Sequence, residues 1–130
     1  DTLLQRRPNS LFAERRSNET LIMVEDFIRN MNFTSVHDLQ PNRTISAING
    51  VIARSYPISM KYAKGRWLHF RQIVLEDASG WVLVNVWGKV ATELLRGQRI
   101  HIKKPYCFYQ NGALCLTLSI GSCLKICTQA

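Results

Sequence analysis

The stretch Arg66–Val90, RWLHFRQIVLEDASGWVLVNVWGKV, constrains the fold of this chain more than any other part. It predicts two antiparallel strands, Trp67–Leu75 and Trp81–Trp87, joined by the turn Asp77–Gly80, where Asp accepts hydrogen bonds from the following backbone and Gly tolerates a positive φ. On the second strand three valines alternate with four other residues, Trp81, Leu83, Asn85 and Trp87. Because successive side chains point to opposite faces, we expect one aliphatic core face and one face with two tryptophans and an amide.

Two interpretations of these tryptophans are open. They pack beneath a loop or an N-terminal helix, as many half-buried rings do, or they form a platform on which planar ligands stack. A half-buried strand seldom exposes two such rings without a binding role.

The distribution of charge favours a polyanionic partner. The formal net charge is +8, but residues 1–40 hold five Arg against six acids, whereas residues 41–130 hold twelve Lys or Arg against three acids. A basic surface on a β-rich domain favours nucleic acid over a membrane, since no basic amphipathic helix accompanies it. The alternative is a basic surface that serves solubility.

The length of 130 residues suits one domain with its own core. The sequence has no run of 18 apolar residues and no signal peptide pattern, so we expect no membrane partner and a reducing, intracellular location, the nucleus. The chain begins at Asp1 rather than Met, which suggests a piece of a longer protein.

The cysteines and histidines do not predict a metal site or a cofactor. Cys107, Cys115, Cys123 and Cys127 contain no C-x-x-C pair, and the three histidines lie far from them in the sequence. Cys107 and Cys115 could face each other across a hairpin, but free buried thiols are the commoner outcome in a reducing compartment. The three N-x-[ST] sequons are interpreted as chance matches.

The chain is expected to divide into three parts. Residues 1–17 predict a flexible basic arm, and residues 18–40 an amphipathic helix, over about 18–31, with a linker that packs on the following domain. Residues 41–130 predict the main β domain. Binding of the helix to a separate partner is the less favoured alternative.

Five strands follow in order along this main domain. Thr44–Arg54 is the first, with a bend or bulge at Gly50 that would let one strand serve two sheets, and Ser55–Gly65 is expected to be a loop. In the central hairpin Leu68 and Phe70 have one parity and Ile73 and Leu75 the other, so a bulge near Arg71 and Gln72 is predicted. The remaining expectations are a short helix over Gly88–Arg96 with Val90, Leu94 and Leu95 inward, a fourth strand over Gln98–Lys104, a turn at Gln110–Gly112 and a fifth strand over Ala113–Ile120.

Five strands with a helix between the third and fourth are the order of an OB-fold barrel, so the expected class is all-β with short helices. The segments GVIARS, FRQIVLEDASGWVLVNVWG and LLRGQRIHIKKPYCFYQNGALCLTL resemble the single-strand DNA-binding OB domains of the replication protein A large subunit and its meiotic and telomeric relatives. The resemblance covers about Thr44 to Ile126. Its most telling part is the D-x-S-G turn followed by alternating apolar residues and a final aromatic.

The resemblance implies roles for particular residues. An aromatic at the position of Trp87 stacks on a base, and one of Phe108 or Tyr109 stacks on another. Lys61, Lys64 and Arg66 would hold phosphates. The chain departs from the family at Arg71, where a core residue is usual, in the short loop between the fourth and fifth strands, and in lacking the large subunit's zinc ribbon.

The sequence therefore predicts a non-enzymatic module that binds single-stranded nucleic acid, DNA first and RNA as the alternative, in replication, repair, recombination or telomere maintenance. The alternative is a protein-interaction OB domain that docks on other OB-fold subunits of such a complex. No phosphate-binding Gly loop, nucleophile elbow or metal-spaced carboxylate set indicates an enzyme or a small-molecule substrate. The candidate binding residues are Trp87, Trp67, Tyr62, Phe108, Tyr109, Lys61, Lys64, Arg66, Arg71, Asn85, Lys89, Lys103 and Lys104.

Overall fold

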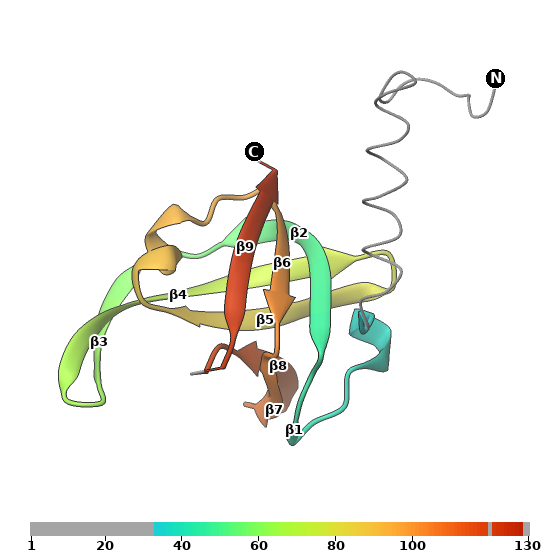
Figure 1. Ribbon diagram of the computed structural model, residues 1–130, viewed down its shortest axis with the longest axis horizontal. Helices are drawn as coiled ribbons and strands as arrows, with labels where there is room; N and C mark the ends of the chain where they lie inside the picture. Colours follow the sequence, from blue (N-terminus) through green and yellow to red (C-terminus); the bar gives the residue numbers. More distant parts are fainter. Residues whose placement is uncertain (1–32, 120, 129–130) are drawn as a thin grey trace. The chain divides into compact units, whose positions relative to one another are not determined.

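One strongly curled sheet runs through the computed structural model, which describes residues 33–119 and 121–128 (Figure 1). The predicted arm over 1–17 and helix over 18–31 lie outside the described residues. The strands are β1 (Arg43–Thr44), β2 (Ala47–Ser55), β3 (Ser59–Ala63), β4 (Arg66–Asp77), β5 (Gly80–Trp87), β6 (Arg99–Lys103), β7 (Tyr106–Gln110), β8 (Ala113–Thr117) and β9 (Cys123–Thr128), with the 3₁₀ helices η1 (Val36–Asp38) and η2 (Lys89–Glu93). Neither helix of the described part has the length to span a bilayer.

β2 is shared between two parts of the sheet. Residues 47–51 pair with β6 and residues 51–55 pair with β4, and the β4 register shifts between Ile52 and Arg54. The close crossing requires Gly50, because a Cβ there would lie 2.6 Å from the backbone oxygen of Glu76. The predicted double use of this strand is confirmed, whereas the bulge lies between Ile52 and Arg54 and Gly50 is a point of close approach.

The last four strands form one long, broken hairpin. Within the turn predicted over Gln110–Gly112, Asn111 and Gly112 both have positive φ, 54° and 84°, as a two-residue hairpin turn requires. β7 pairs with β8 next to this turn, whereas β6 pairs with β9 beyond the break at Lys104 and Pro105. Because β8 also pairs in parallel with β5, and β6 pairs with β2, the hairpin links the two ends of the curled sheet.

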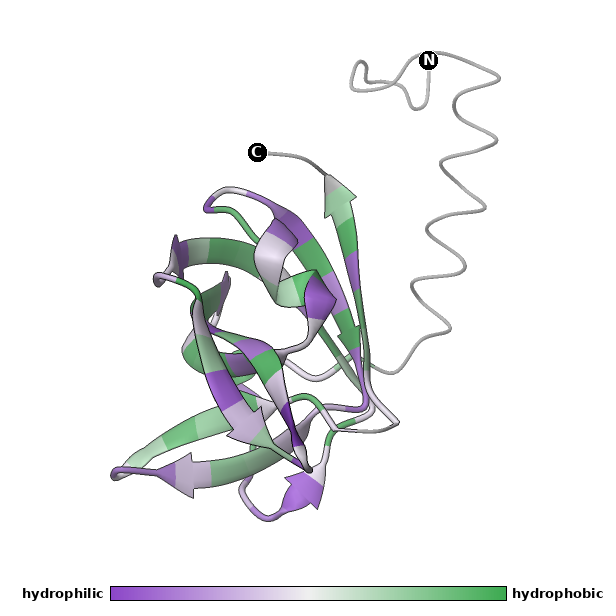
Figure 2. Ribbon diagram, turned by 90° about the vertical axis from the view of Figure 1, so that its left-hand side faces the viewer, coloured by the Kyte–Doolittle hydropathy of each residue, from purple (hydrophilic) through white to green (hydrophobic). Residues whose placement is uncertain are grey.

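The five-stranded barrel prediction is confirmed in this form. β6 with β7 and β8 with β9 are two broken strands, β1 is a two-residue addition, and β3 is an extra strand on β4. Hydrophilic and hydrophobic residues alternate along the strands (Figure 2). The apolar side chains of one parity fill the interior, and the largest fully buried ones are Ile48, Ile52, Ile73, Leu75, Leu94, Ile100, Ile102 and Leu116. Burial of each contributes about 1.5–3 kcal/mol.

Three local expectations were wrong. β4 pairs with β5 from Phe70 to Asp77 without a register shift, so there is no bulge near Arg71. The expected loop over Ser55–Gly65 contains β3, which forms a hairpin with β4 through a turn at Lys64 and Gly65, both at positive φ. The expected helix over Gly88–Arg96 is the shorter η2, and Leu95 is exposed instead of buried.

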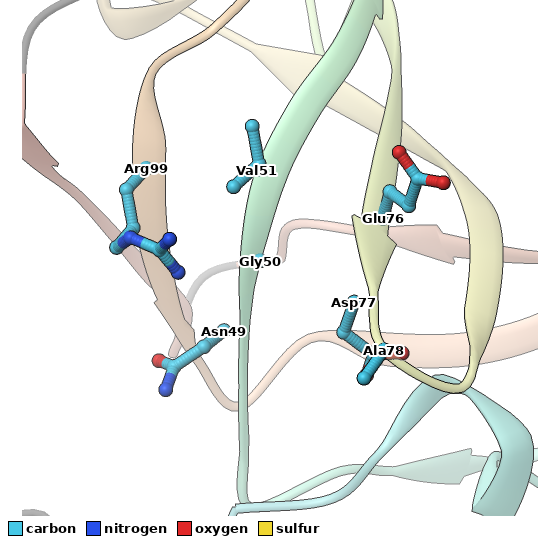
Figure 3. A pocket seen from close by; sticks show the side chains of 7 residues that line it. All are labelled: Asn49, Gly50, Val51, Glu76, Asp77, Ala78 and Arg99. Carbon is cyan, nitrogen blue, oxygen red and sulfur yellow. The ribbon is translucent and has the colours of Figure 1, made fainter.

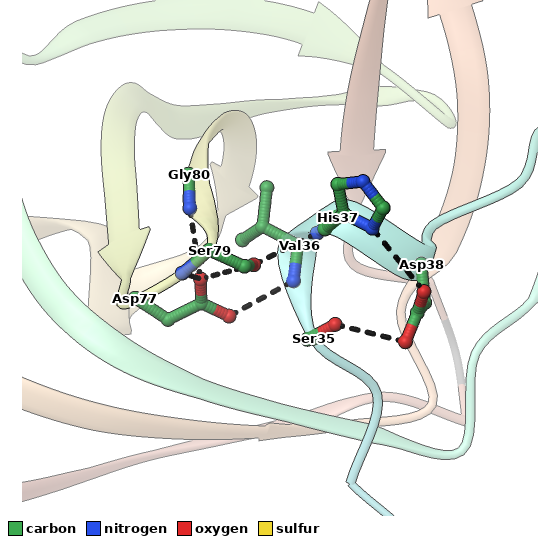
Figure 4. Close-up of polar contacts among 7 residues, drawn as sticks. All are labelled: Ser35, Val36, His37, Asp38, Asp77, Ser79 and Gly80. Atoms are coloured by element: carbon green, nitrogen blue, oxygen red, sulfur yellow. Dashed lines mark hydrogen bonds and ion pairs between the residues drawn. The ribbon is translucent and has the colours of Figure 1, made fainter.

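Asp77 closes the central hairpin and joins it to the preceding chain (Figure 4). Its Oδ1 accepts hydrogen bonds from the backbone N–H of Ser79 at 2.8 Å and of Gly80 at 3.1 Å and from the Ser79 hydroxyl at 2.7 Å. Its Oδ2 accepts the N–H of Val36 at 2.8 Å, and the N–H of His37 donates to the Ser79 hydroxyl. Partial burial opposes ionisation, but these hydrogen bonds outweigh it and hold the pKa of Asp77 below its ordinary value.

Asp77→Asn is expected to lower the free energy of unfolding by about 1–3 kcal/mol at pH 7, since its one oxygen serves Ser79 and Gly80 only if its NH₂ group faces the N–H donor of Val36. The depressed folded pKa means that the stabilising contribution is complete above the unfolded pKa of about 3.9 and is lost as the pH falls through the folded pKa. The stability gap between wild type and variant should therefore narrow below about pH 4. Urea unfolding at several pH values measures it, with the exposed neighbour Glu76→Gln as control. A gap that is absent at pH 7, or as large at pH 2.5, contradicts this role.

Candidate nucleic-acid interface

The outer face of β4 and β5 carries the candidate interface. The unbroken register places side chains of even number on β4 beside side chains of odd number on β5. The inward partners of the opposite parity include Ile73, Leu75 and the valines of β5, which are buried. The outward pairs are Phe70 with Trp87, Gln72 with Asn85, Val74 with Leu83 and Glu76 with Trp81.

Trp87 lies at the end of β5 in an aromatic cluster. Its ring centroid is 4.7 Å from that of Phe70, with the planes at 63°. The ammonium group of Lys61 lies 4.5 Å from the Phe70 centroid on the same side of the sheet. Both rings are half-buried, so each is supported from beneath and keeps part of its surface open. Two rings and a cation therefore meet at the point where the barrel passes into the β3–β4 hairpin.

A row of amides lies next to this cluster. Asn85 is 6 % exposed, and its Oδ1 accepts a hydrogen bond from Gln72 Nε2 at 3.0 Å. Its Nδ2 donates to Gln110 Oε1 at 3.4 Å. These contacts hold Asn85 and make its amide a rigid part of the floor of the outer face.

A shallow pocket of about 440 Å³ occupies the opposite end of the outer face. The guanidinium of Arg54 lies over the Tyr56 ring at 5.5 Å, and Trp81 is 62 % exposed. The pocket also contains the Glu76 carboxylate, whose charge offsets that of Arg54. It is lined by Ala53, Arg54, Tyr56, Val74, Glu76, Trp81 and Leu83.

β3 and the first residues of β4 project from the barrel as a two-stranded arm (Figure 1). The register divides its side chains between two faces. Lys61 is opposite Leu68, two residues before Phe70, and shares the parity of the outer face. Tyr62 is opposite Trp67, and both have the other parity. Trp67 and Tyr62, predicted with Trp87 as binding residues, therefore lie on the reverse face of the arm.

The predicted cations lie in different places. Lys64 and Arg66 are exposed at the turn of the arm, and Lys89 is exposed two residues after Trp87. Lys103 pairs with β2 and β9, on a wall of the barrel away from β4 and β5. Lys104 is exposed at the break between β6 and β7, so neither of these two lysines joins the Trp87 cluster.

Arg71 was predicted as a binding residue, but its side chain does not reach the outer face. It has the inward parity of Ile73, and its Nη1 donates to Ser55 Oγ at 2.7 Å and to the Leu94 carbonyl at 3.0 Å. Ser55 Oγ also donates to the Leu94 carbonyl. The guanidinium thus lies inside the barrel, where it donates to the carbonyl of the residue that follows η2. An inward Arg71 therefore needs no bulge in β4.

Phe108 and Tyr109 lie on opposite faces of β7. Phe108 is opposite Cys115, which pairs with Leu83 of the outer face, and its ring stacks at 6.3 Å on Tyr106. Tyr109 is opposite Leu114, has the other parity and is 61 % exposed. Of the two predicted alternatives, Phe108 is the one that continues the face of Trp87.

A second pocket, of about 360 Å³, lies where β2 crosses between β6 and β4 (Figure 3). The side chains of Arg99 and Glu76 flank β2 from its two sides, and Asp77 lies at the turn below. Two carboxylates against one guanidinium make this pocket a poor site for a polyanion.

Sequence reasoning missed Phe70, Gln72, Arg54 and Gln110 as members of the outer face. An unbroken alternation through residues 70–76 would have indicated the first two.

The described residues contain no group of three or more His, Cys, Asp or Glu side chains that could hold a metal. The four cysteines are free, and burial raises the pKa of the Cys115 thiol to about 11.

Comparison with known proteins agrees with the strand order. No protein-family model matches the sequence, and no curated protein gives a significant match. Among solved structures, the second OB-fold domain of replication protein A from Methanococcus maripaludis superposes with a TM-score of 0.64 at 19% identity, over 76% of this chain and 98% of that one. The chain has an OB fold.

Two further solved structures agree with this OB fold. The OB domain of Ta0387 from Thermoplasma acidophilum gives a TM-score of 0.63 at 16% identity, over 75% of this chain and 89% of that one. A replication protein A heterotrimer bound to ssDNA gives 0.63 at 16% identity, over 75% of this chain and 25% of the matched chain. The chain therefore resembles OB domains of replication protein A and related archaeal proteins in fold.

Arg71→Leu is expected to lower the free energy of unfolding by about 1–3 kcal/mol, because it removes two hydrogen bonds to partly buried groups. Arg66→Leu, on the same strand but exposed, is the matched control and should change it by less than about 0.5 kcal/mol. Thermal and urea unfolding of the two variants make the comparison. Equal stability of Arg71→Leu and Arg66→Leu would contradict the inward role.

Proposed function

We propose that this chain binds single-stranded nucleic acid, DNA in the first place, across the outer face of β4 and β5 near the arm. The observation that carries the proposal is the cluster of Trp87, Phe70 and Lys61, with two half-buried rings and an ammonium 4.5 Å from one of them. Ring faces with adjacent cations are what a single strand requires, since its bases are free to stack and its phosphates follow alongside.

The distribution of charge indicates which end of the outer face attracts phosphates. Lys61, Lys64 and Arg66 lie on or near the arm, whereas Glu76 lies at the opposite end beside Trp81. Phosphates are therefore attracted to the Trp87 end, whereas at the Trp81 end the charges of Arg54 and Glu76 offset each other. A strand that stacks on Trp87 extends from there toward the arm or toward Phe108.

The expected affinity combines two contributions. Each stacked base supplies about 1–3 kcal/mol and tolerates any base. Each neutralised phosphate on a single strand adds about 0.7 to the slope of log affinity against log salt. The Asn85 amide is already bonded to Gln72 and Gln110, so we expect modest base preference.

The similarity to a replication protein A heterotrimer bound to ssDNA supports a role beside other OB-fold subunits in genome maintenance. We propose such subunits as partners. RNA is the alternative ligand, and a titration with oligo-dT, oligo-U and duplex of equal length separates the three.

Trp87→Ala is expected to weaken binding of labelled oligo-dT by about 5- to 150-fold with an unchanged salt slope, because stacking releases no counterions. Trp81→Ala is the matched control on the same strand and face, and should change the affinity by less than about threefold, since it lies beside Glu76. Lys61→Ala with Lys64→Ala should instead flatten the slope by about 1–2 units. Fluorescence anisotropy between about 50 and 200 mM salt measures both quantities.

Two results would count against the proposal. One is an unchanged affinity of Trp87→Ala with a melting temperature several degrees lower, which would make Trp87 a packing residue of the Phe70 cluster. The other is a complete lack of oligonucleotide binding by the wild-type chain at about 50 mM salt.

A further inference from the structure

The reverse face of the arm is an exposed apolar surface separate from the Trp87 cluster. Met60 is 49 % exposed, Tyr62 63 % and Trp67 64 %, and cross-strand pairing puts all three on one face with His69. The rings of Tyr62 and Trp67 meet edge to face at 5.5 Å. Three large apolar side chains gathered at this exposure on one short hairpin indicate a contact surface rather than scattered exposure.

The same arm offers backbone hydrogen-bonding groups. Within the described residues β3 pairs only with β4, so its other edge presents unpaired N–H and C=O groups. An extended segment that pairs with this edge places alternate side chains on the two faces of the arm. One set would lie beside Met60 and Tyr62, and the other set beside Lys61.

The charge of the arm indicates which kind of segment pairs with the free edge of β3. Residues 55–75 contain no acid, and Lys61, Lys64 and Arg66 lie on the arm. A second copy of the chain paired antiparallel at this edge would bring the lysines of the two arms together, which is unfavourable. A strand with acidic side chains on the Lys61 face is complementary in charge.

The composition of the reverse face favours protein over nucleic acid. Its members Met60, Tyr62 and Trp67 are residue types enriched in protein interfaces. The arm's lysine within β3, Lys61, has the opposite parity and lies over Phe70. A nucleic-acid surface would combine its rings with cations on the same face.

We propose that the free edge of β3 accepts an extended segment of a partner protein as an additional strand, with apolar side chains on Met60 and Tyr62 and acidic side chains toward Lys61. Trp67 supports this contact from β4, through Tyr62. The rings of this site, Tyr62 and Trp67, differ from those of the proposed nucleic-acid face, and Lys61 is common to both. The proposal does not depend on whether Trp87 binds a base.

The test uses the full chain and a synthetic ten-residue peptide in which Asp alternates with Val or Leu. Amide shifts in a ¹⁵N NMR titration should be saturable and centred on Ser59–Ala63. Tyr62→Ala and Trp67→Ala should each weaken the peptide about tenfold or more, as central interface aromatics do. Trp81→Ala, which removes a tryptophan of nearly equal exposure from the other face, should leave it within about twofold.

Two control peptides test whether binding depends on the alternating order of the peptide's residues and on its backbone N–H groups, and not only on its amino-acid composition. The same residues arranged as an acidic block and an apolar block should bind about tenfold more weakly or worse, and so should a peptide with a central Pro, which cannot donate to the ladder. Either control peptide binding as well as the alternating one would overturn the proposal.

Three other outcomes would also overturn it. The first is the absence of saturable shifts in Ser59–Ala63. The second is peptide binding that is lost in Trp87→Ala but kept in Trp67→Ala, which would assign the peptide to the nucleic-acid face. The third is a dimer in sedimentation that Trp67→Ala converts to a monomer, which would make a second copy the occupant of the edge.

Discussion

The register between β4 and β5 is the constraint on which the rest of this structure depends. Eight consecutive pairs run from Phe70 with Trp87 to Asp77 with Gly80. A slip of one residue would turn every buried side chain of one strand to the outside. The four hydrogen bonds accepted by the Asp77 carboxylate hold the turn that sets this register, and they tie it to the chain at Val36. A single turn thus determines both the core and the face that carries Trp87.

The same alternation has a second consequence where β4 leaves the barrel. Beyond Phe70 the strand continues into the arm, and the pleat sends Lys61 to one face and Tyr62 and Trp67 to the other. Residues that lie close in the sequence therefore belong to different surfaces. One surface suits stacked bases and phosphates, and the other suits an extended, acidic segment of protein. The two surfaces share Lys61, so phosphates and an acidic segment compete for its ammonium group.

The sequence predicted those parts of the fold that depend on local signals. The central hairpin, the Asn111–Gly112 turn and the buried isoleucines of β6 follow from alternation and turn chemistry. The Gly50 crossing was also predictable, since an interior Gly in a strand indicates a bend or a close approach.

The wrongly predicted bulge arose from contacts between distant residues. An inward arginine looked like a break in the pattern, but Arg71 reaches Ser55 and the Leu94 carbonyl, which no local signal reveals. Because buried positions are usually apolar, Phe70 was assigned to the core together with Ile73 and Leu75. Their opposite parities then required a bulge between them. The arm was missed because its turn puts Lys64 at positive φ, a conformation that its sequence does not favour.

The most direct test of the proposed interface is a map of backbone amides in the full chain, by ¹⁵N NMR, before and after addition of oligo-dT. The account predicts that the shifts concentrate on β5 near Trp87, on β4 from Phe70 to Gln72 and on the residues around Lys61, and that β6 and β9 stay unchanged. Shifts centred on β6 and β9, around Lys103, would contradict it and move the interface to the opposite wall of the barrel.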